Sequence, residues 1–222
     1  PDSAKSAEAN YAEDYWQYRW GVGTPIVKGR HWRAYLAQRH QSGRILNGPL
    51  ADLTKFSVAF PNQFSGVRQQ ATESRVTLGY DDRDHGVTTE RGTFLETFAE
   101  VSRRGFLSAY DYERYGADCR WFAPWAEDKV LAVQAKYEQI IGSTPPFWLL
   151  PRLGGKYSLR SYGAGRYTDR AMTVVNVEQR FKMFEKKVGG VTTEFQLAPF
   201  VGAGTVFDNP GRAAAKYVRP AV

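Results

Sequence analysis

Residues 153–162 read LGGKYSLRSY, in which two adjacent glycines precede an arginine that stands near an aromatic residue. A glycine pair lets the backbone adopt positive φ without a clash at Cβ. An arginine presents a planar, permanently charged fork that binds a carboxylate. Further along, residues 174–181 read VVNVEQRF, an alternating segment with Glu178 on its polar face. We therefore predict that a tight turn delivers Arg160 to an acid on a neighbouring strand.

Alternation of apolar and polar residues continues through most of the chain. It is clearest in segments near 76–80, 95–101, 114–121, 131–138, 175–181 and 194–201. The segments run about 9–12 residues, the length of a tilted membrane-spanning strand, whereas soluble sheets use about five or six. Their polar faces hold charges of both signs. The pattern favours an antiparallel transmembrane β-barrel with a charged lumen, and alternation alone leaves a soluble β-sandwich or barrel open.

The organisation predicted for the chain is a polar tail or linker over residues 1–14 and a barrel domain over 15–222. Within that domain we expect a strand from residue 15, a weakly patterned strand over 31–40 and a loop over 41–52. A short strand is expected near 54–60, and a long glycine-rich loop over 142–170. We count about ten strand candidates in all.

Composition excludes several classes of protein. The 222 residues include 21 Gly and 14% aromatic residues, which favours β-structure. No run of 18 apolar residues is present, so a helical membrane protein is excluded. The net charge of +7 comes from basic residues scattered singly along the strands, which argues against a nucleic-acid partner. One cysteine, Cys119, excludes an internal disulfide framework.

Candidates for bond chemistry or metal binding are weak. His31, His40 and His85 have no metal-ligand spacing, and the acids of segment 81–84 lack the spacing of a Ca²⁺ loop. No Ser/His arrangement for nucleophilic catalysis is evident. We expect neither an enzyme nor a cofactor nor a metal.

Four segments, in order, resemble the BamA/TamA superfamily of outer-membrane β-barrels, the bacterial surface antigen family. The first is LGYDDRD at 78–84 followed by ERGTFLE at 90–96, similar to a strand hairpin of the family. The second is the loop with Gly-Gly and Arg160, continuing to RYTDR at 166–170. The third and fourth are the strands NVEQRF at 176–181 and PFVGAGTVF at 199–207.

The resemblance implies that the long loop folds into the barrel lumen and that Arg160 pairs with Glu178 on the inner wall, helped by Asp169. The predicted loop anchor comprises Gly154, Gly155, Arg160, Tyr162, Asp169 and Glu178. Two departures from the family pattern stand out. Ser161 occupies the position of a usual glycine, and Gly202 occupies the position of a second acid.

The resemblance also implies a function. Members insert β-barrel proteins into the bacterial outer membrane, or move polypeptides across it, by pairing an exposed strand edge with an incoming strand. The expected partners are outer-membrane lipid (lipopolysaccharide or phospholipid), unfolded barrel clients and other envelope subunits. A structural or accessory subunit of a larger envelope complex is the alternative. Because the superfamily closes with sixteen strands and most members carry POTRA domains, we expect this sequence to be part of a larger barrel.

Overall fold

A single curved β-sheet dominates the structure, a computed structural model that describes residues 9–27, 31–49, 51–52, 54–61, 64, 66–86, 88–105, 107–143, 145–209 and 218–222. The sheet has eleven strands in the order β13-β12-β10-β7-β6-β5-β4-β2-β1-β3, with β11 paired to β10. Its elements are β1 (Ala9–Pro25), β2 (Trp32–Asn47), β3 (Thr54–Lys55), α1 (Phe56–Ala59), β4 (Gln69–Asp81), β5 (Gly92–Ser102), β6 (Tyr112–Ala126), β7 (Lys129–Gly142), β10 (Ala171–Val188), β11 (Val191–Leu197), β12 (Phe200–Phe207) and β13 (Arg219–Ala221).

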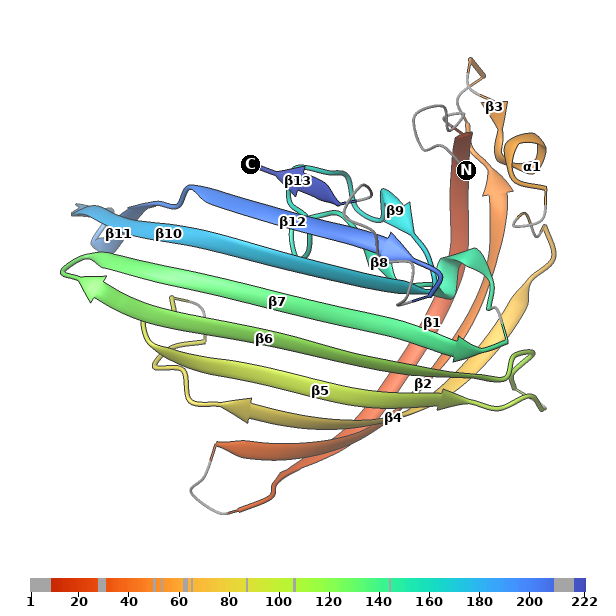
Figure 1. Ribbon diagram of the computed structural model, residues 1–222, viewed down its shortest axis with the longest axis horizontal. Helices are drawn as coiled ribbons and strands as arrows, with labels where there is room; N and C mark the ends of the chain where they lie inside the picture. The colour runs from red at the N-terminus through yellow and green to blue at the C-terminus, as the bar shows by residue number, and fades with distance from the viewer. Residues whose placement is uncertain are drawn as a thin grey trace.

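Neighbouring long strands pair antiparallel, mostly as consecutive hairpins. The chain between β7 and β10 carries the short 3₁₀ helix η2 (Phe147–Leu149) and a separate two-stranded sheet of β8 (Arg152–Leu153) and β9 (Tyr167–Thr168). Figure 1 shows that the sheet curls, with β1 and β2 running steeply relative to β7 and β10. Among the described residues no pairing joins β1 to β13, so the structure is a partial barrel.

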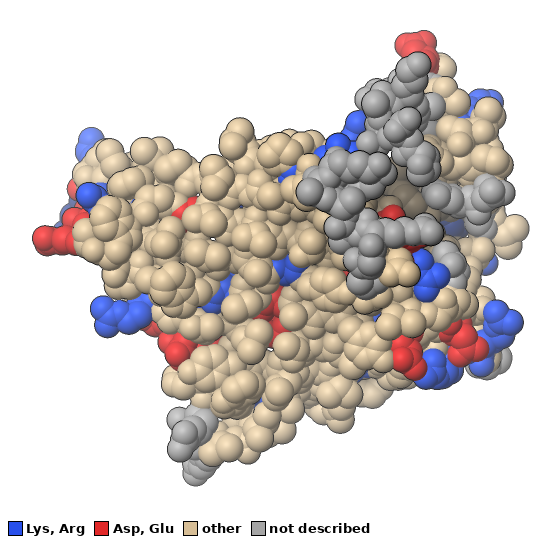
Figure 2. All heavy atoms as spheres, in the orientation of Figure 1, with Lys and Arg blue, Asp and Glu red and all other residues tan. Residues whose placement is uncertain are grey.

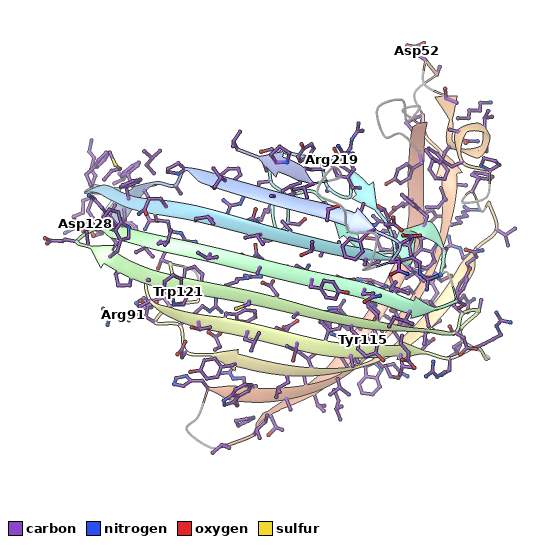
Figure 3. All side chains as sticks on the ribbon, viewed as in Figure 1. Asp52, Arg91, Tyr115, Trp121, Asp128 and Arg219 are labelled. Atoms are coloured by element: carbon purple, nitrogen blue, oxygen red, sulfur yellow. The ribbon has the colours of Figure 1, made fainter. Side chains whose placement is uncertain are left out.

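One face of the sheet exposes apolar and aromatic side chains. On β1 these are Trp16, Tyr18, Trp20 and Val22, and the series continues with Leu36, Val76, Tyr115, Trp121, Val175 and Val201. Figure 2 shows uncharged atoms over the middle of the molecule and charged atoms gathered toward its two ends, apart from a short line across the middle. Figure 3 labels Tyr115 and Trp121 along β6, and Arg91 and Asp128 at the strand ends. An exposed apolar band between charged rims is typical of the lipid-facing wall of a barrel.

The opposite face, called the inner face below, holds a buried network of charges. Glu73 and Glu100 are almost fully buried, and Arg39 bridges them, with Nε 2.5 Å from Glu73 and Nη2 3.1 Å from Glu100. Arg114 lies between Glu100, at 3.0 Å, and Glu138, at 2.7 Å. The Tyr112 hydroxyl donates to Glu73. Because buried charges are costly unless paired, these contacts fix the register of five adjacent strands on this face.

The long alternating segments form strands as predicted, and the N-terminal part differs. β1 begins at Ala9, inside the predicted tail, of which residues 1–8 lie outside the described part of the chain. The loop predicted over 41–52 is wrong as far as Asn47, because β2 continues that far. The residues that suggested a loop there have a packing role: Gln41 donates to buried Glu73, and Gly43 leaves room for the Trp148 ring.

The strand predicted near 54–60 is largely wrong. Only Thr54–Lys55 pairs as a strand, and Phe56–Ala59 form the helical turn α1. Phe56 is buried against the rings of Tyr11 and Phe147, with centroids 5.3 and 5.7 Å away. This aromatic cluster at the strand ends draws the segment out of the sheet. Among the described residues no helix is long and apolar enough to cross a membrane.

Substituting Arg114→Met keeps the side-chain volume but removes the cation that lies between Glu100 and Glu138, while Arg39 still pairs with Glu73 and Glu100. We expect the free energy of unfolding to fall by about 3–5 kcal/mol, the cost of breaking a buried ion pair from one side. The measurement is denaturant unfolding of the protein folded in lipid vesicles. Arg103→Met is the matched control, because Arg103 is 60% exposed in its ion pair with Glu113. Equal effects of the two substitutions would contradict the burial argument.

Candidate functional site: the loop on the inner face

The glycine pair of the loop is conformationally required. Gly154 and Gly155 adopt φ of 116° and 94°, values that residues with a Cβ rarely adopt. A Cβ on Gly154 would also collide with the carbonyl oxygen of Gly163. The turn is closed by hydrogen bonds from the Gly155 N–H to the Tyr162 carbonyl, at 2.9 Å, and from the Gly154 N–H to Ser158 Oγ, at 3.0 Å. The pair therefore folds segment 153–162 back on itself, as its sequence predicts.

Apolar contacts press this turn against β10 and β12. Leu153 and Leu159 are fully buried and pack with Met172 and Val174 of β10. Gly204 of β12 makes the approach possible, because a Cβ there would lie 2.9 Å from Leu153 Cδ1. The Asn176 side chain adds a polar tie by donating to the carbonyl of Ser158 at 2.8 Å. The loop is thus packed directly onto the inner face.

Arg160 and Glu178 form an ion pair in the structure. The second oxygen of the Glu178 carboxylate accepts from Arg180 Nε at 2.6 Å, so this carboxylate lies between two guanidinium groups. Arg160 also stacks over the ring of Phe200, 4.4 Å from its centroid. The Glu178 side chain is only 9% exposed, whereas that of Arg160 is 33% exposed. Because the acid is the more buried partner, loss of Arg160 would leave this carboxylate with Arg180 as its one cation among the described contacts.

Asp169 does not join this pair in any contact among the described residues. Its carboxylate accepts from the Arg170 N–H at 2.7 Å, at the start of β10. Burial raises the pKa of the Asp169 carboxyl, the Arg170 N–H opposes that rise, and the nearby Asp208 charge adds to it. The second charged partner of the anchor is instead Arg180, which sequence reasoning missed. The sequence could have predicted this contact, because Arg180 stands two residues after Glu178 on the same polar face of the strand.

Ser161 and Tyr162 tie the loop to the edge strand β13. Ser161 Oγ donates to the backbone oxygen of Val222 at 2.7 Å, and the Tyr162 hydroxyl donates to the Pro220 carbonyl at 3.0 Å. β13 has three residues, and among the described strands it pairs with β12 alone. The serine that stands at the glycine position of the family pattern thus supplies a hydrogen bond to the residue that directly follows β13.

Gly202 lies directly across from Asn176 in the pairing of β12 with β10. A Cβ on Gly202 would collide with Asn176 Oδ1. The Asn176 side chain therefore occupies the space in which a second acid would stand. The anchor has one acid and two arginines, rather than one arginine and two acids.

The other end of the loop contacts the far strands of the sheet. Arg114 Nη2 donates to the Leu149 carbonyl at 2.5 Å, and Arg152 Nη2 lies 2.5 Å from Glu13 on β1. Trp148 and Leu149 are buried in the aromatic cluster with Ile45 and Phe56. The segment that carries β8 and β9 therefore lies between β10 and β12 on one side and β1 on the other (Figure 1).

The described residues contain no cluster of three or more His, Cys, Asp or Glu side chains that could hold a metal ion. His31 Nδ1 hydrogen-bonds the Asp81 carbonyl oxygen, and His40 Nδ1 hydrogen-bonds Thr72 Oγ1. Both histidines are thus engaged in contacts between strands. The contacts of the loop therefore connect three parts of the sheet: the strands β10 and β12, the strand β1, and the edge at β13.

The sequence matches the Omp85 superfamily domain over residues 2–219. The chain belongs to the Omp85 superfamily. Its fold is similar to the crystal structure of BamA from Haemophilus ducreyi lacking POTRA domains 1–3, with a TM-score of 0.69 and 16% sequence identity. That alignment covers 98% of this chain and 48% of the BamA chain, so the chain spans about half the length of its structural relative. No curated protein matches the sequence.

These comparisons confirm the predicted family and the predicted outer-membrane β-barrel fold of this Omp85 chain. They concern the fold and the whole domain rather than single residues.

Substituting Gly154→Ala should destabilise the loop by about 1–3 kcal/mol, because alanine is strained at this φ and its methyl group meets a backbone carbonyl. The measurement is limited proteolysis of the loop, followed by denaturant unfolding. Gly163→Ala is the matched control, since an added Cβ there meets nothing within 4 Å. Unchanged protease resistance in Gly154→Ala would show that the turn does not depend on this backbone geometry.

Proposed function

We propose that this Omp85 chain forms part of a barrel in the bacterial outer membrane that assists the insertion or translocation of outer-membrane proteins, with its loop serving as a lumenal support. The main support for the proposal is the set of contacts that the loop makes with the sheet. Arg160 ties it to Glu178 on β10, while Ser161 and Tyr162 tie it to the edge strand β13. One loop thus connects the barrel wall with a strand at the edge of the sheet.

Strand-edge templating is the proposed mechanism. β1 has 17 residues, and the strand β3 pairs only with its Ala9–Asn10 end. Along the rest of β1, no described strand occupies the edge facing away from β2. Backbone N–H and C=O groups cannot stay unpaired in lipid, so such an edge in the membrane is completed by another strand. An incoming client strand would bind by the same main-chain hydrogen bonds.

The proposed role needs no bond chemistry. The apolar outer face, with its exposed tryptophans and tyrosines, suits outer-membrane lipid as a surrounding partner. Unfolded barrel clients and other envelope subunits are the proposed protein partners.

A second candidate function is that of a structural or accessory barrel within a larger envelope complex. Gly202 favours it, because the second acid of the family pattern is missing and Asn176 fills its place. In that role β1 would pair with a fixed neighbour strand and not exchange clients.

Arg160→Gln and Glu178→Gln should each lower the unfolding free energy by about 1–3 kcal/mol, because each leaves a charged partner less compensated in a partly buried site. If the loop supports assembly, both variants should also slow the insertion of a radiolabelled barrel client into proteoliposomes that contain the full-length protein. Arg104→Gln, at an exposed position of the β5–β6 turn, is the control for loss of one positive charge. Wild-type insertion rates in both anchor variants would refute the loop's role in assembly.

Photo-crosslinking separates the two functions. p-Benzoylphenylalanine at Tyr18, on β1, should crosslink to a client that is being inserted if the β1 edge is a template. The same residue at Tyr137 is the matched control, because Tyr137 lies on β7, which is paired on both sides. Crosslinks from Tyr18 to one constant envelope protein, with or without client, would support the accessory role instead.

A further inference from the structure

A small hollow lies between the loop and the inner face. Its volume is ≈ 160 Å³, and it is lined by side chains of β6, β7, β10 and the loop, among them Arg120, Gln134, Lys156, Arg160, Glu178 and Arg180. At roughly 30 Å³ for each water, such a space holds about five waters. A tetrahedral oxyanion with part of its hydration shell has a similar size.

The charges around the hollow do not balance. Four cations line it: Arg120 from β6, Lys156 and Arg160 from the loop, and Arg180 from β10. Two carboxylates compensate them. Asp118 accepts from Arg120 at 2.7 and 3.1 Å, and Glu178 is shared by Arg160 and Arg180. Lys156 has no acidic partner among the described residues, so four positive charges face two negative ones.

Hydrogen-bond donors are also left over on these cations. A guanidinium carries five N–H donors. Among the described contacts, Nη2 of Arg160, Nη2 of Arg180 and Nη1 of Arg120 donate to no acceptor. The contact recorded for the Lys156 ammonium is with the adjacent Tyr157 ring, 4.7 Å from its centroid. Unused donors and two excess positive charges at one partly enclosed place are the features of an anion site.

We propose that this hollow binds a small phosphate-bearing dianion, which bridges Lys156 and Arg160 of the loop to Arg120 and Arg180 of the wall. Phosphate carries about −1.5 to −2 charges at pH 7, which matches the excess. The hollow opens on the inner face, on the other side of the sheet from the apolar wall, so the phosphate source is soluble rather than a lipid headgroup. The bound anion would strengthen the attachment of the loop to the wall. This consequence for assembly rests on the proposed function, whereas the binding itself does not.

Calorimetric titration of the full-length protein in a non-ionic detergent tests the site, with inorganic phosphate as the probe and the ionic strength held constant with chloride. We expect saturable binding of one phosphate per chain. Lys156→Gln should weaken it about tenfold, the effect of losing one charge-assisted hydrogen bond. Lys187→Gln is the matched control, since Lys187 lies in the exposed β10–β11 hairpin and should leave the affinity unchanged. Arg120→Gln provides a second variant on the wall side.

Absence of saturable binding, or equal affinities in Lys156→Gln and Lys187→Gln, would overturn the proposal. A water-soluble short-chain phosphatidic acid tests the lipid source, and tighter binding of it than of inorganic phosphate would overturn the soluble source. The titration is independent of client insertion. Normal client insertion by both Arg160→Gln and Glu178→Gln would refute the loop's role in assembly and leave the binding result as it stands, whereas absence of phosphate binding would refute only this site.

Discussion

Charged side chains on the inner face of this sheet must find partners, and that constraint shapes the rest of the structure. The outer face is largely apolar, and most charge gathers toward the ends of the strands and on the inner face. Glu73, Glu100 and Glu178 are all nearly buried, and each is met by arginines from neighbouring strands or from the loop. Because a buried carboxylate without a cation is costly, strand register and loop position are set by the same pairs.

Small residues decide where the loop can approach the wall. Gly154 allows the turn itself, Gly204 admits Leu153, and Gly43 admits Trp148. The missing side chain of Gly202 leaves space for the Asn176 side chain, which donates a hydrogen bond to the carbonyl of Ser158. The strand glycines thus mark the positions where the loop packs closely against the sheet. The ion pairs of the arginines help to hold the loop in that position.

The sequence was most informative where one local rule decided the outcome. Alternation predicted the long strands, positive φ was foreseeable from Gly154 and Gly155, and the partner of Arg160 could be named as Glu178. It was least informative where distant segments meet. The extension of β2 to Asn47 depends on Glu73 and Trp148, and the withdrawal of Phe56 depends on an aromatic cluster from three segments. Ser161 and Tyr162 donate hydrogen bonds to backbone oxygens. Every residue has such an oxygen, so the sequence pattern does not identify these acceptors.

A double-mutant cycle on Arg160 and Glu178 tests most directly whether the loop is held by this pair. The free energy of unfolding in lipid vesicles would be measured for the wild type, Arg160→Gln, Glu178→Gln and the double variant. Direct pairing predicts that the two single effects fail to add, with a coupling of about 1–3 kcal/mol. Additivity within about 0.5 kcal/mol would mean that the two residues act separately, and the loop would then be held by its apolar contacts and its other hydrogen bonds.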